Sequence, residues 1–193
     1  MMNQLSIIIP ILFFIFGFLT GYFLFFRKYK IEKQKGKEDY LTKVFNYREF
    51  DLRVHDFIRQ SNQNIALALI DLDYFKRIND NYSYELGDEV LTRLVELISH
   101  QIRTSDLLFR FKNGDEFVIV FKDVQSDYLE EIGERLRRTI EHRPFSFNQK
   151  IVYLTASVGQ TMVQHDDTKT SLLKRLESAL KEAKSQRNKV FTM

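Results

Sequence analysis

Acidic side chains stand at the ends of two apolar runs in this sequence. Asp71 closes the run NIALALID, residues 64–71, and Asp73 follows two residues later, which places both on one face of an extended chain. Asp115 and Glu116 stand at the start of the second run, EFVIVF. If the two runs are neighbouring strands, several carboxylates meet, and such like charges repel unless cations or bound protons separate them. The sequence therefore predicts either a divalent metal site or carboxyl groups with raised pKa values.

The available ligands favour magnesium over zinc. The sequence has no Cys, and its four His residues are scattered without a metal-ligand spacing. Mg²⁺ held by one or two carboxylates keeps coordination positions for phosphate oxygens. Lys76 follows the first strand by one helical turn, and Lys184 and Arg187 close the last predicted helix. Because the phosphate loops GxxxxGKS and GxGxxG are absent from the sequence, the pattern favours a palm-type nucleotidyl transferase, in which metal ions hold the phosphates.

A purely structural reading explains the same residues. Asn113, Gly114 and Asp115 are common turn residues, because they tolerate the backbone conformations of tight hairpins. Asp71 would then cap the helix that follows its strand. The residue pattern alone leaves both readings open.

The elements that must position these residues alternate along the chain. Apolar residues recur at helical spacing in residues 47–60, 91–102, 129–140 and 172–183. Short β-rich runs occupy residues 64–71, 107–111, 116–121 and 150–159. This order predicts one α/β domain in which helices flank a mixed, mainly antiparallel sheet.

Five ordered motifs after residue 38 resemble those of one family. They are DYLTKVFNYREF (39–50), DLDYFKRINDNYSYELGDEVL (71–91), FRFKNGDEFVIVF (109–121), LTASVG (154–159) and ALKEAKSQRNKV (179–190). They resemble D-x-L-T-G-L-x-N-R-R, D-x-D-x-F-K-x-I-N-D-x-x-G-H-x-x-G-D-x-x-L, R-x-G-G-D-E-F, T-x-S-x-G and A-L-x-x-A-K-x-x-G-R-N-x-V of the GGDEF domain of diguanylate cyclases. The resemblance runs from Asp39 to Val190 and implies the palm-like nucleotidyl cyclase fold.

The resemblance also implies a reaction and roles for the acidic residues. A diguanylate cyclase condenses two GTP into cyclic di-GMP, and each domain of a homodimer holds one GTP. Asp71, Asp115 and the backbone carbonyl of Leu72 would bind two Mg²⁺ ions, with Mn²⁺ as the alternative metal. Glu116 would assist deprotonation of the 3′-hydroxyl that attacks the α-phosphate of the second GTP. The implied catalytic residues are therefore Glu116, Asp71 and Asp115.

Further residues are implied to contact substrate and product. Asn79 and Asp88 would hydrogen-bond the guanine edge, an arrangement that rejects adenine. The other implied substrate-binding residues are Lys76, Asn113, Gly114, Lys184 and Arg187, of which the three cations would hold the triphosphate. Arg103 and Asp106 match the family's R-x-x-D product-inhibition site, although an Arg and an Asp three residues apart also form a common surface ion pair.

Several positions depart from the family's pattern. Asn113 stands where the first Gly of the signature is expected, and one extra residue precedes Asp115. Lys43 and Ser83 replace glycines, Tyr84 replaces a His, and the segment KSQRN lacks a Gly. These departures keep two alternatives to the cyclase open. One is a degenerate module that binds GTP or a cyclic dinucleotide and signals through a partner, and the other is a palm enzyme with a different product.

The N-terminal segment predicts a membrane anchor. Residues 5–26 are uncharged and would extend about 33 Å as a helix, which matches a bilayer core of roughly 30 Å. No Lys or Arg precedes the run and no small-x-small site follows it, so the pattern favours an anchor over a cleaved signal peptide. Six basic residues against one acidic residue at residues 27–37 place the following chain in the cytoplasm by the positive-inside rule. Gly17 and Gly21 have the GxxxG spacing that lets two helices approach closely.

These features divide the chain into an anchor at residues 1–26, a basic linker at 27–38 and a GGDEF domain at 39–193. The formal net charge of +3 is local, because 23 basic residues face 25 acidic residues from residue 38 onward. This balance excludes the basic surface typical of a nucleic-acid-binding domain, so no nucleic acid partner is expected. We expect a single-pass protein of the cell inner membrane with its N-terminus outside. Its expected partners are GTP, a second copy of the chain, membrane lipid and a regulatory protein of the membrane or cytoplasm.

Overall fold

The computed structural model describes residues 16–25, 27, 36–112, 114–147 and 150–193. The chain divides into two compact units, Met1–Lys37 and Glu38–Met193. In the first unit residues 16–25 are helical, and both Gly17 and Gly21 have open space where a side chain would stand. Residues 5–15 and 26 of the predicted anchor lie outside the described residues. Within the described part of the chain, no helix combines the length and the apolarity needed to cross a membrane.

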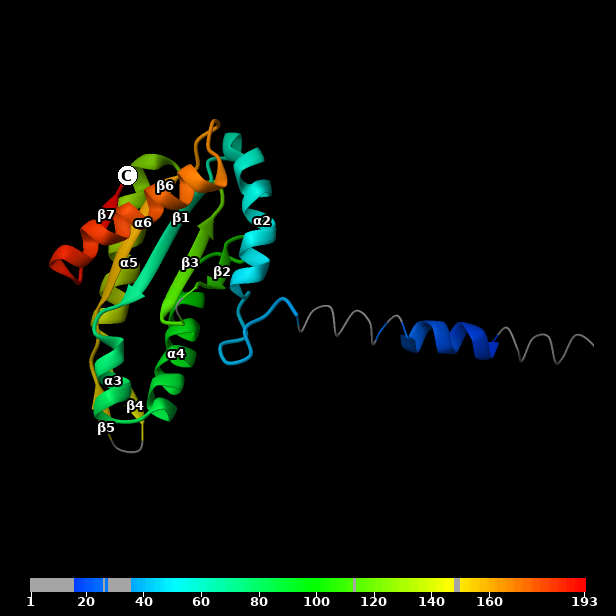
Figure 1. The fold of residues 1–193 in the computed structure, drawn as a ribbon, viewed down its shortest axis with the longest axis horizontal. Helices are drawn as coiled ribbons and strands as arrows, with labels where there is room; N and C mark the ends of the chain where they lie inside the picture. The colour runs from blue at the N-terminus through cyan, green and yellow to red at the C-terminus, as the bar shows by residue number, and fades with distance from the viewer. Residues whose placement is uncertain (1–15, 26, 28–35, 113, 148–149) are drawn as a thin grey trace, which may run out of the picture. The chain divides into compact units, whose positions relative to one another are not determined.

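The second unit is built on a five-stranded mixed sheet in the order β2-β3-β1-β6-β7 (Figure 1). Its strands are β1 (Ala66–Leu72), β2 (Leu107–Arg110), β3 (Glu116–Phe121), β6 (Ala156–Met162) and β7 (Val190–Thr192). β1 pairs antiparallel with both β3 and β6, whereas the edge strand β7 runs parallel to β6. A separate two-stranded sheet joins β4 (Phe145–Phe147) to β5 (Lys150–Val152).

Helices cover both faces of this sheet. They are α2 (Tyr47–Arg59), α3 (Phe75–Asn81), α4 (Tyr84–Ser99), α5 (Ser126–Glu141) and α6 (Lys169–Gln186), with a 3₁₀ turn, η1, at Ser61–Gln63. Leu67 and Leu69 of β1 share a buried cluster with residues of α2 and α6, whereas Ala68 and Ile70 share one with residues of α3, α4 and α5. Because successive residues of a strand point to opposite faces, Asp71 lies on the face that α6 covers.

Side-chain caps fix the first turns of three helices that frame the sheet. Asn46 accepts a hydrogen bond from the Glu49 backbone N–H before α2, and Ser83 accepts one from the Leu86 N–H before α4. Thr168 forms a capping box with Ser171 before α6. Such caps satisfy backbone donors that the helix itself leaves open. Ser83, which stands in place of a family Gly, therefore serves as the N-cap of α4.

The predicted α/β fold with helices flanking a mixed sheet is confirmed, with several elements added. α3, β4 and β7 were not predicted, and the predicted strand at 150–159 is divided into β5 and β6. α3 has seven residues and begins after Tyr74, whose left-handed φ of 59° interrupts any regular pattern. β7 has three residues and pairs only at the sheet edge with β6. Elements this short depend on their tertiary partners rather than on their own periodicity.

Candidate functional site

Strand pairing brings the predicted carboxylates to one end of the sheet. β1 and β3 are neighbours, and their register places Asp71 opposite Glu116. Asp115 immediately precedes β3, and Leu72 ends β1. Lys184, in the last turn of α6, places its Nζ 2.6 Å from Asp71 Oδ2. The structure thus brings together the residues for which the sequence predicted metal binding and proton transfer, with one of the predicted phosphate-binding cations beside them.

The acidic groups are costly to ionise at this position. Burial raises the pKa of Asp71, the hydrogen bond and charge of Lys184 lower it, and the charges of Asp115 and Asp73 raise it further. Burial also raises the pKa of Asp115, against a hydrogen bond from its own backbone and the charges of Lys184 and Arg110. A divalent cation would stabilise the ionised form of both carboxylates.

The oxygen ligands fit Mg²⁺ bound jointly with phosphate. Among the described residues no group of three His, Cys, Asp or Glu side chains is arranged to hold a metal ion by itself. Mg²⁺, however, is usually held by one or two carboxylates while substrate phosphates and water complete its coordination. Asp71 and Asp115 supply that share, and neither His nor Cys stands beside them to favour zinc.

An arginine ties the hairpin between β2 and β3 to the first turn of the domain. Arg110 Nε donates to the Gly114 carbonyl oxygen at 2.9 Å, and its Nη1 donates to Asp39 Oδ1 at 2.7 Å. Asp39 also accepts hydrogen bonds from the backbone and the hydroxyl of Thr42. Gly114 has a φ of +85°, a backbone conformation that side chains disfavour, so glycine is required here. Asn113, the other predicted hairpin residue, lies outside the described residues.

Asp73 joins the end of β1 to the two segments beside it. It is buried and accepts hydrogen bonds from Thr155 Oγ1 at 2.7 Å, Ser157 Oγ at 2.8 Å and the Asn188 backbone N–H at 2.9 Å. The loop after β1 is thereby fixed to β6 and to the turn after α6. The alternative in which Asp71 caps the next helix is wrong, because α3 has Tyr74 at its N-cap and no side-chain cap.

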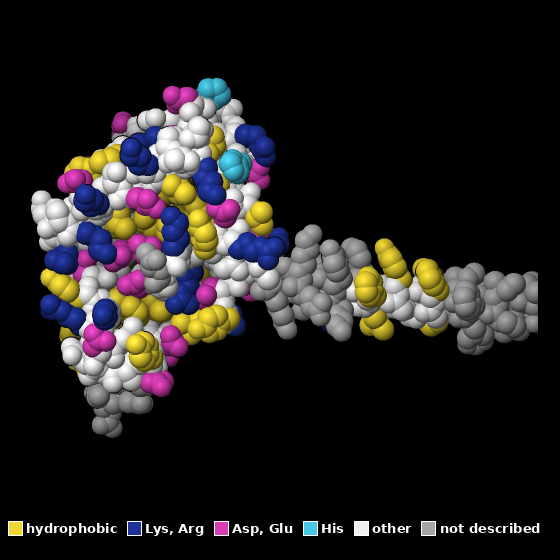
Figure 2. All heavy atoms as spheres, viewed as in Figure 1, with side chains coloured by type: hydrophobic (Ala, Val, Ile, Leu, Met, Phe, Trp, Pro, Cys, Tyr) yellow, Lys and Arg dark blue, Asp and Glu magenta, His cyan; other side chains and the backbone are white. Residues whose placement is uncertain are grey.

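The three predicted phosphate-binding cations stand in different surroundings. Lys184 pairs with Asp71, whereas Lys76 is exposed in the first turn of α3. Arg187, at the C-cap of α6, holds its Cζ 4.3 Å from the centre of the Tyr74 ring. Figure 2 shows, on one face of the domain, acidic side chains near the centre with Lys and Arg side chains around them.

The residues predicted to read guanine lie where α3 meets α4. A Cβ on Gly87 would stand 2.0 Å from Asn79 Oδ1, so the absence of a side chain at Gly87 is what admits Asn79. Asn79 Oδ1 is buried and has no hydrogen-bond partner. Asp88, the next residue after Gly87, is exposed. An unsatisfied amide oxygen is costly in the free protein, which fits a group that hydrogen-bonds a ligand.

The predicted product-inhibition pair lies at the far end of β3 from the carboxylates. Asp106 accepts hydrogen bonds from the backbone N–H groups of Arg103 and Lys122, at 2.9 and 3.1 Å. Lys122 follows the last residue of β3, whereas Glu116 is its first. Asp106 therefore secures the turn before β2, and the described contacts include no ion pair between the side chains of Arg103 and Asp106.

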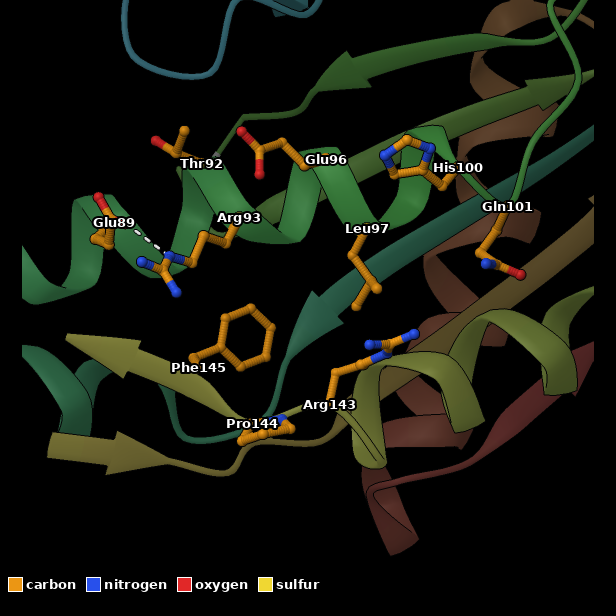
Figure 3. Close-up of a pocket in the computed structure, with 10 residues that line it drawn as sticks. All are labelled: Glu89, Thr92, Arg93, Glu96, Leu97, His100, Gln101, Arg143, Pro144 and Phe145. Carbon is orange, nitrogen blue, oxygen red and sulfur yellow. Dashed lines mark hydrogen bonds and ion pairs between the residues drawn. The ribbon is translucent and has the colours of Figure 1, made fainter. Parts of the chain in front are cut away.

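A cavity of about 690 Å³ lies between α4 and the segment after α5, apart from the carboxylates (Figure 3). Its lining includes Arg93, which pairs with Glu89, together with Leu97, Arg143 and Phe145. None of the sequence-predicted site residues lines it. Size alone therefore does not locate the candidate site.

Asp39, Arg110 and Tyr74 were absent from the sequence-predicted set, and Asp73 was predicted only as one of the carboxylates that meet. Asp39 and Arg110 hold the hairpin, Asp73 holds the loop after β1, and Tyr74 contacts Arg187. Asp39, Arg110 and Asp73 occupy specified positions of the family patterns given above, so a signal for them was present. Tyr74 occupies an unspecified position, and only the fold places it beside Arg187.

The geometry defines an α/β domain in which carboxylates and a lysine gather at the ends of β1 and β3. The model of the family described as "Diguanylate cyclase, GGDEF domain" matches residues 37–189. This chain belongs to the GGDEF domain family.

Known proteins similar to the chain include membrane proteins and solved structures of GGDEF proteins. An uncharacterized membrane protein of Staphylococcus aureus (strain USA300) is 33% identical over 166 residues, which are 82% of this chain and 46% of the relative. The chain therefore spans about half the length of this relative. The coiled coil and GGDEF domain of DgcB from Caulobacter crescentus, solved with c-di-GMP, has a TM-score of 0.84 at 21% identity and covers 92% of this chain and 97% of its own. The diguanylate cyclase SiaD from Pseudomonas aeruginosa, solved with its activator SiaC, has a TM-score of 0.79 at 25% identity. The match covers 98% of this chain and 75% of the SiaD chain.

Proposed function

We propose that this chain is a diguanylate cyclase, which condenses two GTP into cyclic di-GMP through two 3′-5′ phosphodiester bonds. The observation that carries the proposal is the meeting of Asp71, Asp115 and Glu116 at the ends of β1 and β3, with Lys184 in contact with Asp71. Membership of the GGDEF family supports it, as does the similarity to SiaD.

In this proposal Asp71 and Asp115 bind metal, whereas Glu116 accepts a proton. Asp71, Asp115 and the Leu72 carbonyl would hold Mg²⁺, or Mn²⁺ in its place, which would supply polarisation of the phosphates and a lower pKa of the attacking hydroxyl. Glu116 accepts the proton of the 3′-hydroxyl, whose oxygen bonds to the α-phosphorus of the second GTP while pyrophosphate leaves. Lys184 exchanges Asp71 for a phosphate oxygen when nucleotide binds.

The remaining predicted residues bind the substrate. Asn79, whose Oδ1 lacks a partner, and Asp88 hydrogen-bond the guanine edge. Lys76 and Arg187 contact the triphosphate as charge partners, since both lie on segments that flank the end of β1. Gly114 and Asn113 let the hairpin backbone approach the nucleotide. Arg103 and Asp106 bind the cyclic product at the far end of β3.

The proposal includes a membrane anchor and a homodimer. Relatives 33% identical to this chain are named membrane proteins, which supports the anchor at residues 5–26 of a single-pass inner-membrane protein. Each domain holds one GTP, so two domains must face each other, and confinement to a membrane raises the effective concentration of the second domain. A regulatory protein is a further proposed partner, by analogy with SiaD and its activator.

A second candidate is a GGDEF module that binds GTP or a cyclic dinucleotide without turnover. The ion pair between Lys184 and Asp71 favours it, because binding of a metal at Asp71 must displace a contact of 2.6 Å. The extra residue before Asp115 also favours this second candidate, because a shifted hairpin would misplace the Asp115 carboxylate relative to Asp71.

One incubation separates the candidates. The full chain in liposomes, supplied with GTP and Mg²⁺, should yield pppGpG and cyclic di-GMP by mass spectrometry, and Asp115→Ala should abolish both. Asp127→Ala is the matched control, because it removes an exposed Asp on α5. Folded protein that binds GTP but yields neither product would support the second candidate instead. With mixed GTP and ATP, an adenine-containing product would overturn the assignment of cyclic di-GMP.

A further inference from the structure

A second cavity, of about 480 Å³, lies on the face of α3 away from the predicted guanine-reading residues. It is bounded by one side of α3, by the end of α5 and by the segment from β5 to β6. Residues 74, 77, 78 and 81 line it, which is the spacing of one helical face, while Lys76 and Asn79 do not. This cavity is therefore distinct from the proposed GTP site, although α3 contributes to both.

Three aromatic rings and the side chain of Ile151 form the exposed hydrophobic part of the lining of this cavity. Tyr74, Tyr82 and Tyr153 are 49%, 44% and 69% exposed, and all three line it. Arg77 and Arg187 already lie over the Tyr74 ring, so the ring best placed for a planar ligand to stack on is that of Tyr153, the most exposed of the three. Stacking of a base on an aromatic ring is worth about 1–3 kcal/mol and tolerates any base, because every base has a π-face.

The lining contains three charged residues, Asp73, Glu141 and Arg77, and the two acids have hydrogen-bond partners within the domain. Asp73 is engaged by Thr155, Ser157 and Asn188, and Glu141 accepts hydrogen bonds from Arg137 at 2.8 Å and Asn188 Nδ2 at 2.6 Å. These contacts hold the pKa of Glu141 below its ordinary value, the Asn188 hydrogen bond first and the Arg137 hydrogen bond next. The oxygens of both acids are thus engaged inside the domain, and Arg137 compensates the charge of Glu141.

Arg77 is the remaining charged residue of the lining. Its Cζ lies 4.4 Å from the centre of the Tyr74 ring, and it makes no ion pair with any described residue. A guanidinium stacked on a ring keeps its N–H donors, which lie in its own plane, directed away from that ring. Arg77 can therefore donate two hydrogen bonds to a phosphate placed beside the tyrosines.

We propose that this cavity binds a nucleoside monophosphate, with its base against Tyr153 and its phosphate on Arg77. Stacking rings and one uncompensated guanidinium match a planar ring that carries one anionic group. The volume lies in the range of about 300–1,000 Å³ that is usual for small-molecule sites. Nothing in the lining is arranged to reject adenine, so the site should accept AMP, which the proposed guanine-reading site excludes.

The cavity is in contact with the proposed catalytic machinery through Tyr74. Arg187, a proposed triphosphate ligand, lies 4.3 Å from the centre of the ring that Arg77 also contacts. A ligand whose phosphate binds Arg77 therefore changes the surroundings of the Tyr74 ring, and through it those of Arg187. This consequence, a change in the KM for GTP when AMP is bound, rests on the proposed function, whereas binding of AMP does not.

Calorimetric titration of the full chain with AMP and with adenosine tests the site. AMP should bind once per chain and more tightly than adenosine, and Arg77→Ala should weaken AMP at least about fivefold while leaving adenosine unchanged. Tyr153→Ala should weaken both ligands at least about fivefold. Arg77 and Tyr153 are exposed, so these variants should fold normally.

Asn79→Ala is the matched control, because it alters the other face of α3. It should leave AMP binding unchanged, whether or not the chain turns over GTP. The proposal is overturned if millimolar AMP gives no binding, if Arg77→Ala and Tyr153→Ala bind AMP as the unaltered chain does, or if Asn79→Ala alone abolishes binding. Failure of the proposed cyclase reaction would show separately, as absence of product from GTP with AMP binding intact.

Discussion

At the end of β1, the ammonium of Lys184 pairs with the carboxylate of Asp71 and compensates its charge. The contact of 2.6 Å offsets part of the cost of burying this carboxylate. Asp115 has no ion pair with any residue that the structure describes, and burial raises its pKa against the lowering effects of a backbone hydrogen bond and the charges of Lys184 and Arg110. A divalent cation would therefore stabilise the ionised form of Asp71 and Asp115 more than the ammonium of Lys184 does.

Asp115→Asn should stabilise the domain in metal-free buffer. Burial raises the pKa of Asp115, so the folded state disfavours its ionised form, and neutralisation should add about 1 kcal/mol to the free energy of unfolding at pH 7. The gain should shrink as the pH falls through the raised pKa, because the unaltered Asp115 then becomes neutral as well. Denaturant unfolding at pH 7 and pH 4 measures both values, and a loss of stability at pH 7 would contradict the explanation.

Mg²⁺ should make the unaltered chain more stable than Asp115→Asn, the reverse of their order in metal-free buffer. At about ten times its Kd, Mg²⁺ should stabilise the unaltered chain by about 1.4 kcal/mol, or roughly 3–6 °C in Tm, and Asp115→Asn should lose most of this increase. NaCl at equal ionic strength is the control for screening, because Na⁺ binds carboxylates far more weakly than Mg²⁺ does. Equal shifts of Tm in both proteins would show that Mg²⁺ does not bind through Asp115.

Asp39→Asn should weaken the attachment of the hairpin in a pH-dependent way. Burial alone would raise the pKa of Asp39, but the hydrogen bonds from Thr42 and Arg110 outweigh it and hold the pKa below the ordinary value. The stabilisation is therefore present above about pH 4 and is lost as the pH falls through the lowered pKa. Because both side chains are about 15% exposed, screening is limited, and we expect a loss of about 1–2 kcal/mol.

Unfolding measured from pH 7 to pH 3 tests the Asp39 prediction. The difference between the two proteins should be constant from pH 7 to about pH 5 and should narrow below about pH 4. Asp51→Asn is the control, because Asp51 forms an ion pair with Lys169 that is more exposed and hence weaker. A difference that stays constant down to pH 3 would mean that the charge of Asp39 is not responsible.

At the scale of the elements, the sequence predicted the long helices and central strands but not the short connections. Strands such as β1 are continuous apolar runs, and α6 has a clear apolar face, so their patterns are local. The contacts that position the site join residues that are far apart in the sequence. Arg110 and Asp39 are 71 residues apart, and Asn188 and Asp73 are 115 apart, so no local pattern pairs them. Family motifs marked these residues, but only the fold shows what each one holds.

Lys43→Gly should stabilise the turn that opens the domain. Lys43 has a φ of 62°, a left-handed conformation that costs a non-glycine residue roughly 1–2 kcal/mol, partly offset because glycine is more flexible in the unfolded chain. The expected net gain is about 0.5–1 kcal/mol in denaturant unfolding. Lys43→Ala is the matched control, since it loses the hydrogen bond to the Tyr40 carbonyl but keeps the strained backbone, and should show no gain. Equal gains in both variants would point to the side chain instead.

At the scale of the molecule, the proposed reaction requires two copies of the domain. Each set of carboxylates and cations lies within one domain, and a single GTP cannot supply both the hydroxyl and the α-phosphate of the two bonds that are formed. The helix at residues 16–25 carries Gly17 and Gly21 with open space around both, so it offers a surface on which a second copy can pack closely. Pairing would then be set by the N-terminal unit and chemistry by the domain.

Mixing experiments should reveal this requirement. When the unaltered full chain is reconstituted with about a tenfold excess of Asp115→Ala, only about one partner in eleven is competent, so cyclic di-GMP formed per unaltered chain should fall roughly tenfold. An equal excess of Asp127→Ala, which keeps the proposed site, should cause no such fall. Mass spectrometry of the product at constant total protein and lipid provides the measurement. If the yield per chain that carries Asp115 is the same in both mixtures, the reaction is completed without a second domain, and the proposed role of pairing is wrong.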